Sequence, residues 1–178
     1  MTDDSSPTAL ALRIAVVEVE AHASDSGWDQ PSRLFALVRT AELAAAEPEL
    51  AAELGIHDSS AALLTPVEQD LEQHNEPFEE LLASITWPEG VEGALVVVER
   101  VVLPPEAEDQ VPDDPAAASA FAVAHAQRED VRIAAGVLRT GESHCVLRLR
   151  SHDSDDALVH GGEVVPGLVQ ALRETLET

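Results

Sequence analysis

Residues 131–150, VRIAAGVLRTGESHCVLRLR, decide the fold class of this 178-residue chain. In both halves of the stretch, apolar residues alternate with other residues, which is typical of β-strands because successive side chains point to opposite faces of a sheet. A Thr-Gly-Glu segment at 140–142 separates the halves. The stretch therefore predicts a β-hairpin. The alternating apolar positions are Val131, Ile133, Ala135 and Val137, then Cys145, Leu147 and Leu149.

The length of the turn decides which residues pair across this hairpin. A two-residue turn at 140–141 would pair Val137 with His144 and so place apolar residues opposite polar ones. A three-residue loop at 140–142 instead pairs residue 137 with 145, 135 with 147 and 133 with 149. Because a slip of one residue turns a whole strand face over, the apolar pattern favours the three-residue loop. One face is then core, and the other carries Arg132, His144, Arg148 and Arg150.

Helical and extended patterns alternate along the rest of the chain. The apolar run at 33–39 is typical of a strand buried on both faces, although a helix stays open there. Residues 61–69 fit either an edge strand that contains Pro66 or a helix, and we favour the strand. The valine-rich run at 95–103 predicts a central strand. Helices are predicted at 6–27, at 40–55 with a kink at Pro48, at 78–85, from Asp114-Pro115 onward, and at 165–176.

This order of elements predicts an α+β fold with a mixed or mostly antiparallel sheet of about five strands and helices packed on it. The length fits a single domain over residues 1–178, which can bury its own core without disulfides or a structural metal. Residues 104–114 hold three prolines and five acids without periodicity, which indicates an exposed loop.

The charge is strongly acidic, with a formal net charge of −24. All ten basic residues are arginines, and the absence of lysine and tyrosine excludes chemistry that needs a Schiff-base lysine, a P-loop lysine or a tyrosine acid. The middle third, residues 61–120, carries fourteen acids and a single arginine, Arg100. Such a chain is repelled by nucleic acids and anionic membranes, so neither is expected as a partner, whereas basic partners remain possible.

The N-terminal sequence MTDDSSP is acidic where a signal peptide needs positive charge, and no stretch approaches the roughly 20 apolar residues of a membrane span. The lone cysteine, Cys145, cannot form an intramolecular disulfide and fits a reducing compartment. We therefore expect a cytoplasmic protein.

The first candidate site is the basic group on the polar face of the hairpin. Arginine offers a rigid bidentate fork to carboxylates and phosphates, so this face predicts a docking surface for an acidic group. The other interpretation is that these arginines neutralise acids of the same molecule on a solvated sheet face. The binding candidates are Arg132, His144, Arg148 and Arg150.

A second candidate site lies in the segment SHDSDD at 151–156 and the histidine that follows it. Its side chains suit a metal ion, but the spacing matches neither a calcium-binding EF-hand loop nor a His-Glu-x-x-His zinc helix. A solvated acidic turn explains the same composition. The metal candidates are His152, Asp153, Asp155, Asp156 and His160.

No catalytic motif stands out elsewhere in the sequence. There is no G-x-S-x-G elbow and no glycine-rich nucleotide loop, and no cofactor is implied. His144 and Cys145 are neighbours on a strand, so they point to opposite faces and do not form a catalytic pair. Whether Trp28, Trp87 and Phe78 belong to the core or to an interface stays open.

Several stretches together resemble a family of conserved hypothetical proteins from actinobacteria. They are GWDQP at 27–31, LFALV at 34–38 with TAEL at 40–43, VERVVLP at 98–104, REDVR at 128–132, GVLR at 136–139, CVLRLR at 145–150 and VPGL at 165–168. The resemblance spans most of the chain from about residue 27 onward. It implies a single-domain cytoplasmic protein from a GC-rich genome, and it carries no assigned reaction, ligand or catalytic residue.

From these observations we expect a non-enzymatic interaction or accessory module that binds a protein partner through its sheet face or its acidic middle segment. The alternative is a metal-dependent hydrolase that uses the His152–Asp156 segment and His160. A nucleic-acid mimic ranks last, because it would need its acids in ordered rows.

Overall fold

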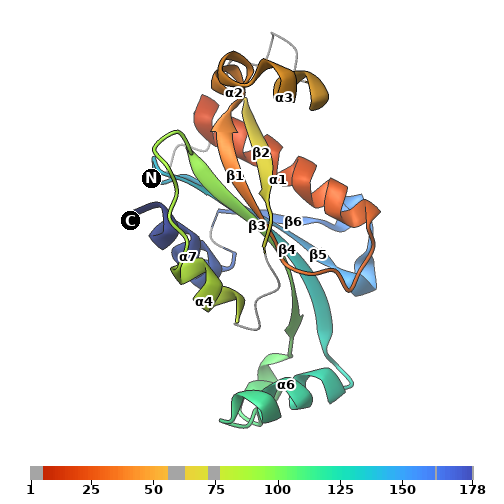
Figure 1. Ribbon diagram of the computed structural model, residues 1–178. Coiled ribbons are helices and arrows are strands. Elements are labelled where there is room, and N and C mark those ends of the chain that lie inside the picture. Colours follow the sequence, from red (N-terminus) through yellow and green to blue (C-terminus); the bar gives the residue numbers. More distant parts are fainter. Residues whose placement is uncertain (1–5, 56–62, 72–76, 163, 178) are drawn as a thin grey trace.

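A computed structural model describes residues 6–55, 63–71, 77–162 and 164–177. These residues form one six-stranded sheet with helices packed on it, so the predicted α+β class is confirmed (Figure 1). The strand order is β2-β1-β3-β4-β5-β6, and every neighbouring pair is antiparallel. The strands are β1 (Arg33–Arg39), β2 (Leu64–Gln69), β3 (Gly93–Val102), β4 (Glu129–Leu138), β5 (Ser143–Leu149) and β6 (Val159–Gly161).

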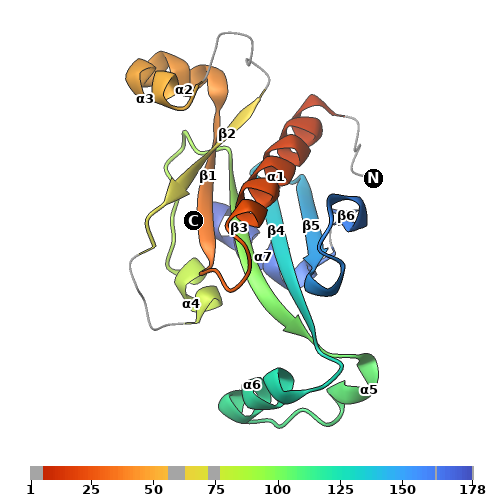
Figure 2. The same cartoon turned by 90° about the vertical axis from the view of Figure 1, so that its right-hand side faces the viewer.

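Helices cover both faces of this sheet. The long helix α1 crosses one face, and α4 and α7 lie on the opposite face (Figures 1 and 2). Helix α1 begins where the sequence predicts, because the Ser6 side chain accepts a hydrogen bond from the Ala9 N–H at 3.0 Å and Pro7 occupies the first turn. The helices are α1 (Pro7–Asp25), α2 (Thr40–Ala46), α3 (Pro48–Glu53), α4 (Phe78–Ala83), α5 (Pro105–Glu108), α6 (Pro115–Ala124) and α7 (Pro166–Glu177), with 3-10 turns η1 (Arg150–His152) and η2 (Asp155–Ala157).

The hydrophobic core is split into two layers by the sheet. Under α1, Leu12 and Val16 pack against Leu95 and Val146. On the other face, the buried side chains of α4 and α7 pack against alternate residues of β3, β4 and β5, Cys145 among them. Because both faces are covered, the central strands are apolar on both sides, which explains the continuous valine run in β3.

The predicted pairing of the β4–β5 hairpin is wrong by two residues. Val137 pairs with Ser143 and Ala135 with Cys145, so the loop is Arg139-Thr140-Gly141 rather than 140–142. Gly141, at φ 108°, occupies the last loop position, where a positive φ favours glycine. Because the slip is two residues and not one, every side chain keeps its predicted face.

The two segments left open by sequence are both strands. Residues 33–39 form β1, and β2 covers residues 64–69, with Pro66 on the edge of the sheet where its missing N–H is tolerated. Residues 61–62 lie outside the described part of the chain. The predicted helix at 40–55 is two helices, α2 and α3, because Glu47 leaves the helical conformation just before Pro48.

The remaining elements agree with the sequence except at two places. A one-turn helix, α5, lies within 104–114, and its Ala107 is buried while its neighbours are largely exposed. The short strand β6 at the other edge of the sheet was not expected from the sequence.

Two of the aromatic residues left open by the sequence belong to the core. Phe78 and Trp87 are half-buried against the core layer under α7, and the Trp87 Nε1–H donates to the Thr175 hydroxyl at 2.9 Å.

Candidate functional site

The predicted basic face of the hairpin is covered rather than open. Arg132 lies on β4, and His144 and Arg148 lie on β5, all on the side of the sheet that α1 crosses, and all three are buried. Arg150 follows β5 in η1 and is the one member of the group whose side chain is substantially exposed. The sheet face therefore offers little of this group to a partner.

Glu20 of α1 is the acid that neutralises the buried part of the group. Its side chain is 1% exposed, and its carboxylate accepts hydrogen bonds from Arg148 Nε at 2.6 Å and from Arg148 Nη2 at 3.0 Å. The same guanidinium reaches Asp153 at 3.1 Å and Asp155 at 2.7 Å. These carboxylates, Glu20 first, raise the pKa of Arg148 above its ordinary value. Arg148 is thus a permanent cation that forms ion pairs with three carboxylates of its own chain.

Trp28 links this ion pair to the surface. The guanidinium of Arg132 lies 4.4 Å from the centre of the Trp28 ring, that of Arg150 lies 5.5 Å from it, and the indole Nε1–H donates to Asp153 Oδ2 at 3.0 Å. The hydrogen bond from Trp28 and the nearby Arg148 lower the pKa of Asp153. Arg132 Nη2 also donates to the Gly27 carbonyl. Trp28 therefore packs between cations of the chain itself.

Arg132 is less well satisfied than Arg148. Its Nη1 is the single buried side-chain nitrogen or oxygen in the described residues that has no hydrogen-bond partner, and the nearest carboxylate oxygen, on Glu20, lies 3.9 Å away. Arg132 is 1% exposed, so its charge depends on Glu20 and on the Trp28 ring for compensation.

The loop between α1 and β1 is held by the same set of charges. Asp29 has a positive φ of 63° and accepts two hydrogen bonds from Arg150, each at 3.1 Å, which lowers the pKa of its carboxyl. The backbone N–H groups of Asp29 and Gln30 donate to the Glu99 carboxylate at 2.8 and 2.6 Å. These contacts, together with the Glu20–Arg148 pair, join α1, the loop, β3, β5 and η1 into one charged network.

The two candidate sites predicted from the sequence, the basic group of the hairpin and the acidic segment that follows it, are consequently joined by ion pairs. Arg132, Arg148 and Arg150 belong to the basic group, and Asp153 and Asp155 of the predicted metal segment pair with Arg148. A guanidinium that already binds carboxylates of its own chain is not available to an external acid.

The metal candidates do not converge on a common point. His152 Nδ1 lies 2.9 Å from Ser151 Oγ, whereas His160 Nδ1 lies 3.5 Å from His144 Nε2, across the β5–β6 pair. Over residues 6–55, 63–71, 77–162 and 164–177, no group of three or more His, Cys, Asp or Glu side chains is placed to hold a metal ion. No geometry in this part of the chain favours the hydrolase alternative.

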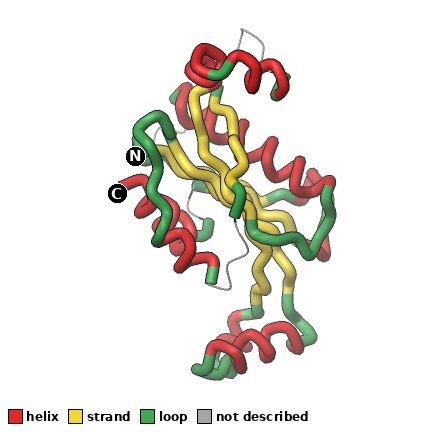
Figure 3. Tube along the Cα trace, in the orientation of Figure 1, coloured by secondary structure: helices red, strands yellow, loops and turns green. Residues whose placement is uncertain are grey.

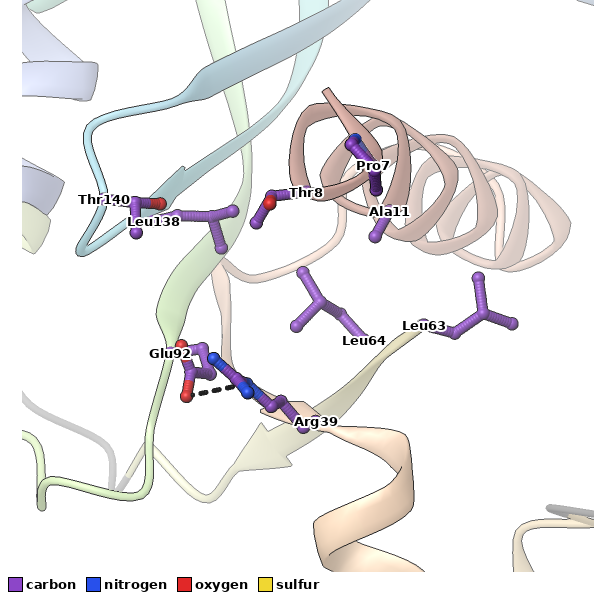
Figure 4. Close-up of a pocket in the computed structure, with 9 residues that line it drawn as sticks. All are labelled: Pro7, Thr8, Ala11, Arg39, Leu63, Leu64, Glu92, Leu138 and Thr140. Carbon is purple, nitrogen blue, oxygen red and sulfur yellow. Dashed lines mark ion pairs between the residues drawn. The ribbon is translucent and has the colours of Figure 1, made fainter. Parts of the chain in front are cut away.

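The cavities among the described residues include an open hollow of about 460 Å³ beside Pro31, Glu68 and Leu71 and two smaller ones. Figure 4 shows one of about 280 Å³ between the start of α1, β2 and the β4–β5 turn, where Arg39 pairs with Glu92 at 3.1 Å beside Leu64 and Leu138. Another, of about 200 Å³, lies beside Arg132 and Glu99. Both are smaller than the 300–1,000 Å³ of ordinary ligand pockets, so neither is our leading candidate.

The most unusual surface is the extension of β3 and β4, which we call the arm (residues 101–130). Pairing of β3 with β1 stops at Val97 and pairing of β4 with β5 stops at Val131, so the ribbon continues beyond its neighbours. Figures 1 and 2 show α5 and α6 at its far end, away from α1, α4 and α7. Ala107 is the one buried residue of the arm, and α6 has none.

Sequence reasoning gave Glu20 no role, left the placement of Trp28 open, and predicted the helix after Asp114 without its exposure. Glu20 interrupts the apolar face of α1, where a charge needs a buried partner, and that was the available signal. For α6, the sequence indicated an Ala-rich helix with Ala117, Phe121 and Ala124 on one side, but nothing local showed that the helix would bury none of its residues.

Fold and site together describe a small acidic α+β protein whose clustered charges pair internally and whose apolar arm helix is exposed. The chain belongs to the PPA1309-like protein family, whose model matches residues 12–177. This match confirms the resemblance to an uncharacterised protein family. No curated protein and no solved structure matches the chain. In the described residues, no helix combines the length and apolar character needed to cross a membrane.

Proposed function

We propose that this protein is a non-enzymatic interaction module that binds a protein partner through the tip of its arm. The observation that carries the proposal is that α6, ten residues long and apolar in nine of them, buries none of its residues in the described structure. Monomeric proteins rarely leave such a surface uncovered, and contiguous exposed apolar surface marks interaction sites.

Further exposed apolar side chains lie beside α6. Val123 on the helix is 57% exposed, and at the end of β3 Val102 is 48% and Val101 37% exposed, these two pointing to opposite faces of the ribbon. The arm is acidic in the same region, as the sequence analysis expected for a docking segment. Of the two surfaces expected from the sequence, the proposal keeps the acidic middle segment and drops the sheet face, which α1 covers.

The lack of packing around α6 supports the same proposal. A helix of ten residues gains little from its own hydrogen bonds, and most helices in proteins depend on tertiary packing of an apolar face. The Asp114 side chain caps α6 by accepting from the Ala117 N–H at 3.0 Å, but few contacts reach α6 from the rest of the chain. A partner that covers α6 would supply the missing packing.

The proposal includes the cellular compartment in which the protein meets its partner. The one cysteine of the chain, Cys145, is buried and cannot form an intramolecular disulfide, which supports a reducing environment, and we place the protein and its partner in the cytoplasm.

Site-specific photo-crosslinking tests the proposal in the cells from which the chain comes. A photoreactive residue at Val123 should crosslink to one protein, and the adduct should disappear when Val102→Ser is added. The matched control is the same photoreactive residue at Leu54, an exposed leucine that caps α3, and Figure 1 shows α3 at the opposite end of the molecule from α6. Equal adducts from both positions, or none from Val123, would overturn the proposal.

A further inference from the structure

The chemistry of the arm tip specifies its occupant, given the proposed function on which this inference rests. We propose that the arm tip (residues 101–127) binds a basic amphipathic segment of the partner protein. Apolar side chains of that segment cover α6 and the end of β3, and its lysine or arginine side chains meet the acids around them.

The apolar part of the occupant follows from α6. Ser119 is the sole residue of the helix with a polar side chain, and six of its ten residues are alanines. Small side chains allow a second helix or an extended segment to approach closely, because the distance between packed helices depends on the residues at the contact. Besides Phe121, which is half-buried, the larger side chains that such a segment would cover are Val123 and Val102.

The basic part follows from the charge of the tip. Residues 101–127 hold five acids and no arginine, and all five acids are exposed. The two arginines that flank this range already have partners in the chain: Arg100 pairs with Glu79, and Arg128 interacts with Asp130 at 3.8 Å and donates to the Val123 carbonyl at the end of α6. Complementary positive charge would steer a partner to this tip and favour its docking. The five acids are Glu106, Glu108, Asp109, Asp113 and Asp114.

The same charge argues against a second copy of this chain as the occupant. Two tips packed on each other would bring two sets of five carboxylates together, and each chain carries a net charge of −24. Nucleic acid is repelled for the same reason. An acidic tip around an apolar helix therefore selects a basic protein segment.

A synthetic probe tests this chemistry without the natural partner. An 18-residue helical peptide of leucine and lysine at amphipathic spacing is titrated into the full chain by calorimetry, with a leucine and glutamate peptide of the same pattern as the opposite charge. The lysine peptide should bind with an affinity that falls as salt rises, and the glutamate peptide should not bind.

Three variants locate the binding. Val102→Ser with Val123→Ser should weaken the lysine peptide about tenfold, through lost apolar contact. Glu106→Gln with Glu108→Gln and Asp109→Asn should weaken it about fivefold and reduce its salt dependence, while leaving the Asp114 cap intact. The matched control, Glu47→Gln with Glu49→Gln and Glu53→Gln, removes the same charge from exposed positions in and beside α3 and should leave binding unchanged.

The outcomes separate this inference from the proposed function. Equal binding of the lysine peptide by all variants would overturn the inference, and it would leave the function standing if Val123 still crosslinks to a partner. A dimer in sedimentation that Val123→Ser abolishes would overturn it in favour of a second copy. Failure of the crosslinking alone would count against the proposed function.

Discussion

Replacing Glu20 by glutamine should destabilise the protein by about 3–5 kcal/mol, the cost of leaving a buried cation without its partner. Glu20 and Arg148 are 1% and 3% exposed and share two hydrogen bonds of 2.6 and 3.0 Å. Glutamine keeps one acceptor oxygen but no charge, so Arg132 also loses its nearest carboxylate. The remaining partners of Arg148, Asp153 and Asp155, are 43% and 88% exposed and therefore replace little of the lost attraction.

Urea unfolding followed by far-ultraviolet circular dichroism measures this loss. With a slope of about 2 kcal/mol per molar urea, a loss of about 3 kcal/mol lowers the midpoint by about 1.5 M. Fluorescence is the poorer probe, because Trp28 stacks on Arg132 within the same network.

Glu18→Gln is the matched control, since Glu18 lies on the same helix and is exposed, and its substitution should change stability by less than about 0.5 kcal/mol. A loss below about 1 kcal/mol for Glu20→Gln would refute the reasoning, because the exposed aspartates would then suffice to neutralise Arg148.

Two further predictions concern Asp153 of the same charged network and Gly136, where α1 packs on the sheet. The lowered pKa of Asp153, caused first by the hydrogen bond from Trp28 and then by Arg148, means that its stabilising contribution is present above the ordinary value of 3.8 and is lost as the pH falls through the lower folded-state value. The difference in unfolding midpoint between wild type and Asp153→Asn should therefore shrink from about pH 5 to about pH 3, and a constant difference would contradict the assignment. Gly136→Ala should cost about 1–3 kcal/mol by overpacking. The added Cβ would lie 2.8 Å from Val16 Cγ2 and 2.9 Å from Leu12 Cδ1, whereas Gly90→Ala, with nothing within 4 Å, is the thermal-unfolding control and should be tolerated.

Local patterns predicted the elements well where one physical rule dominated. The valine run became the central strand β3, the Ser6-Pro7 start capped α1, and Pro66 lies on an edge strand. The hairpin pairing was wrong because two three-residue loops keep the same side-chain faces, so the apolar pattern could not distinguish them. The position of Gly141, which takes a positive φ, distinguishes them in the structure.

The candidate site was predicted only in part. The arginines and the acidic segment were recognised as two separate groups, and the structure joins them around Glu20 and Trp28. Pairing between charged groups depends on which element covers the sheet face, and local periodicity carries no information about that.

The sequence by itself determined the α+β class, the face on which each hairpin side chain lies and the acidity of the middle segment, because each of these follows from local alternation, capping or composition. Only the tertiary structure decided that Arg132 and Arg148 are buried and that α6 is exposed. Glu20 and Arg148 are 128 residues apart in the chain, so their contact exists only once α1 packs across the sheet. Whether a side chain is buried depends on the neighbours that folding brings to it. The arm places α6 at a distance from α1, α4 and α7, so these helices do not cover it.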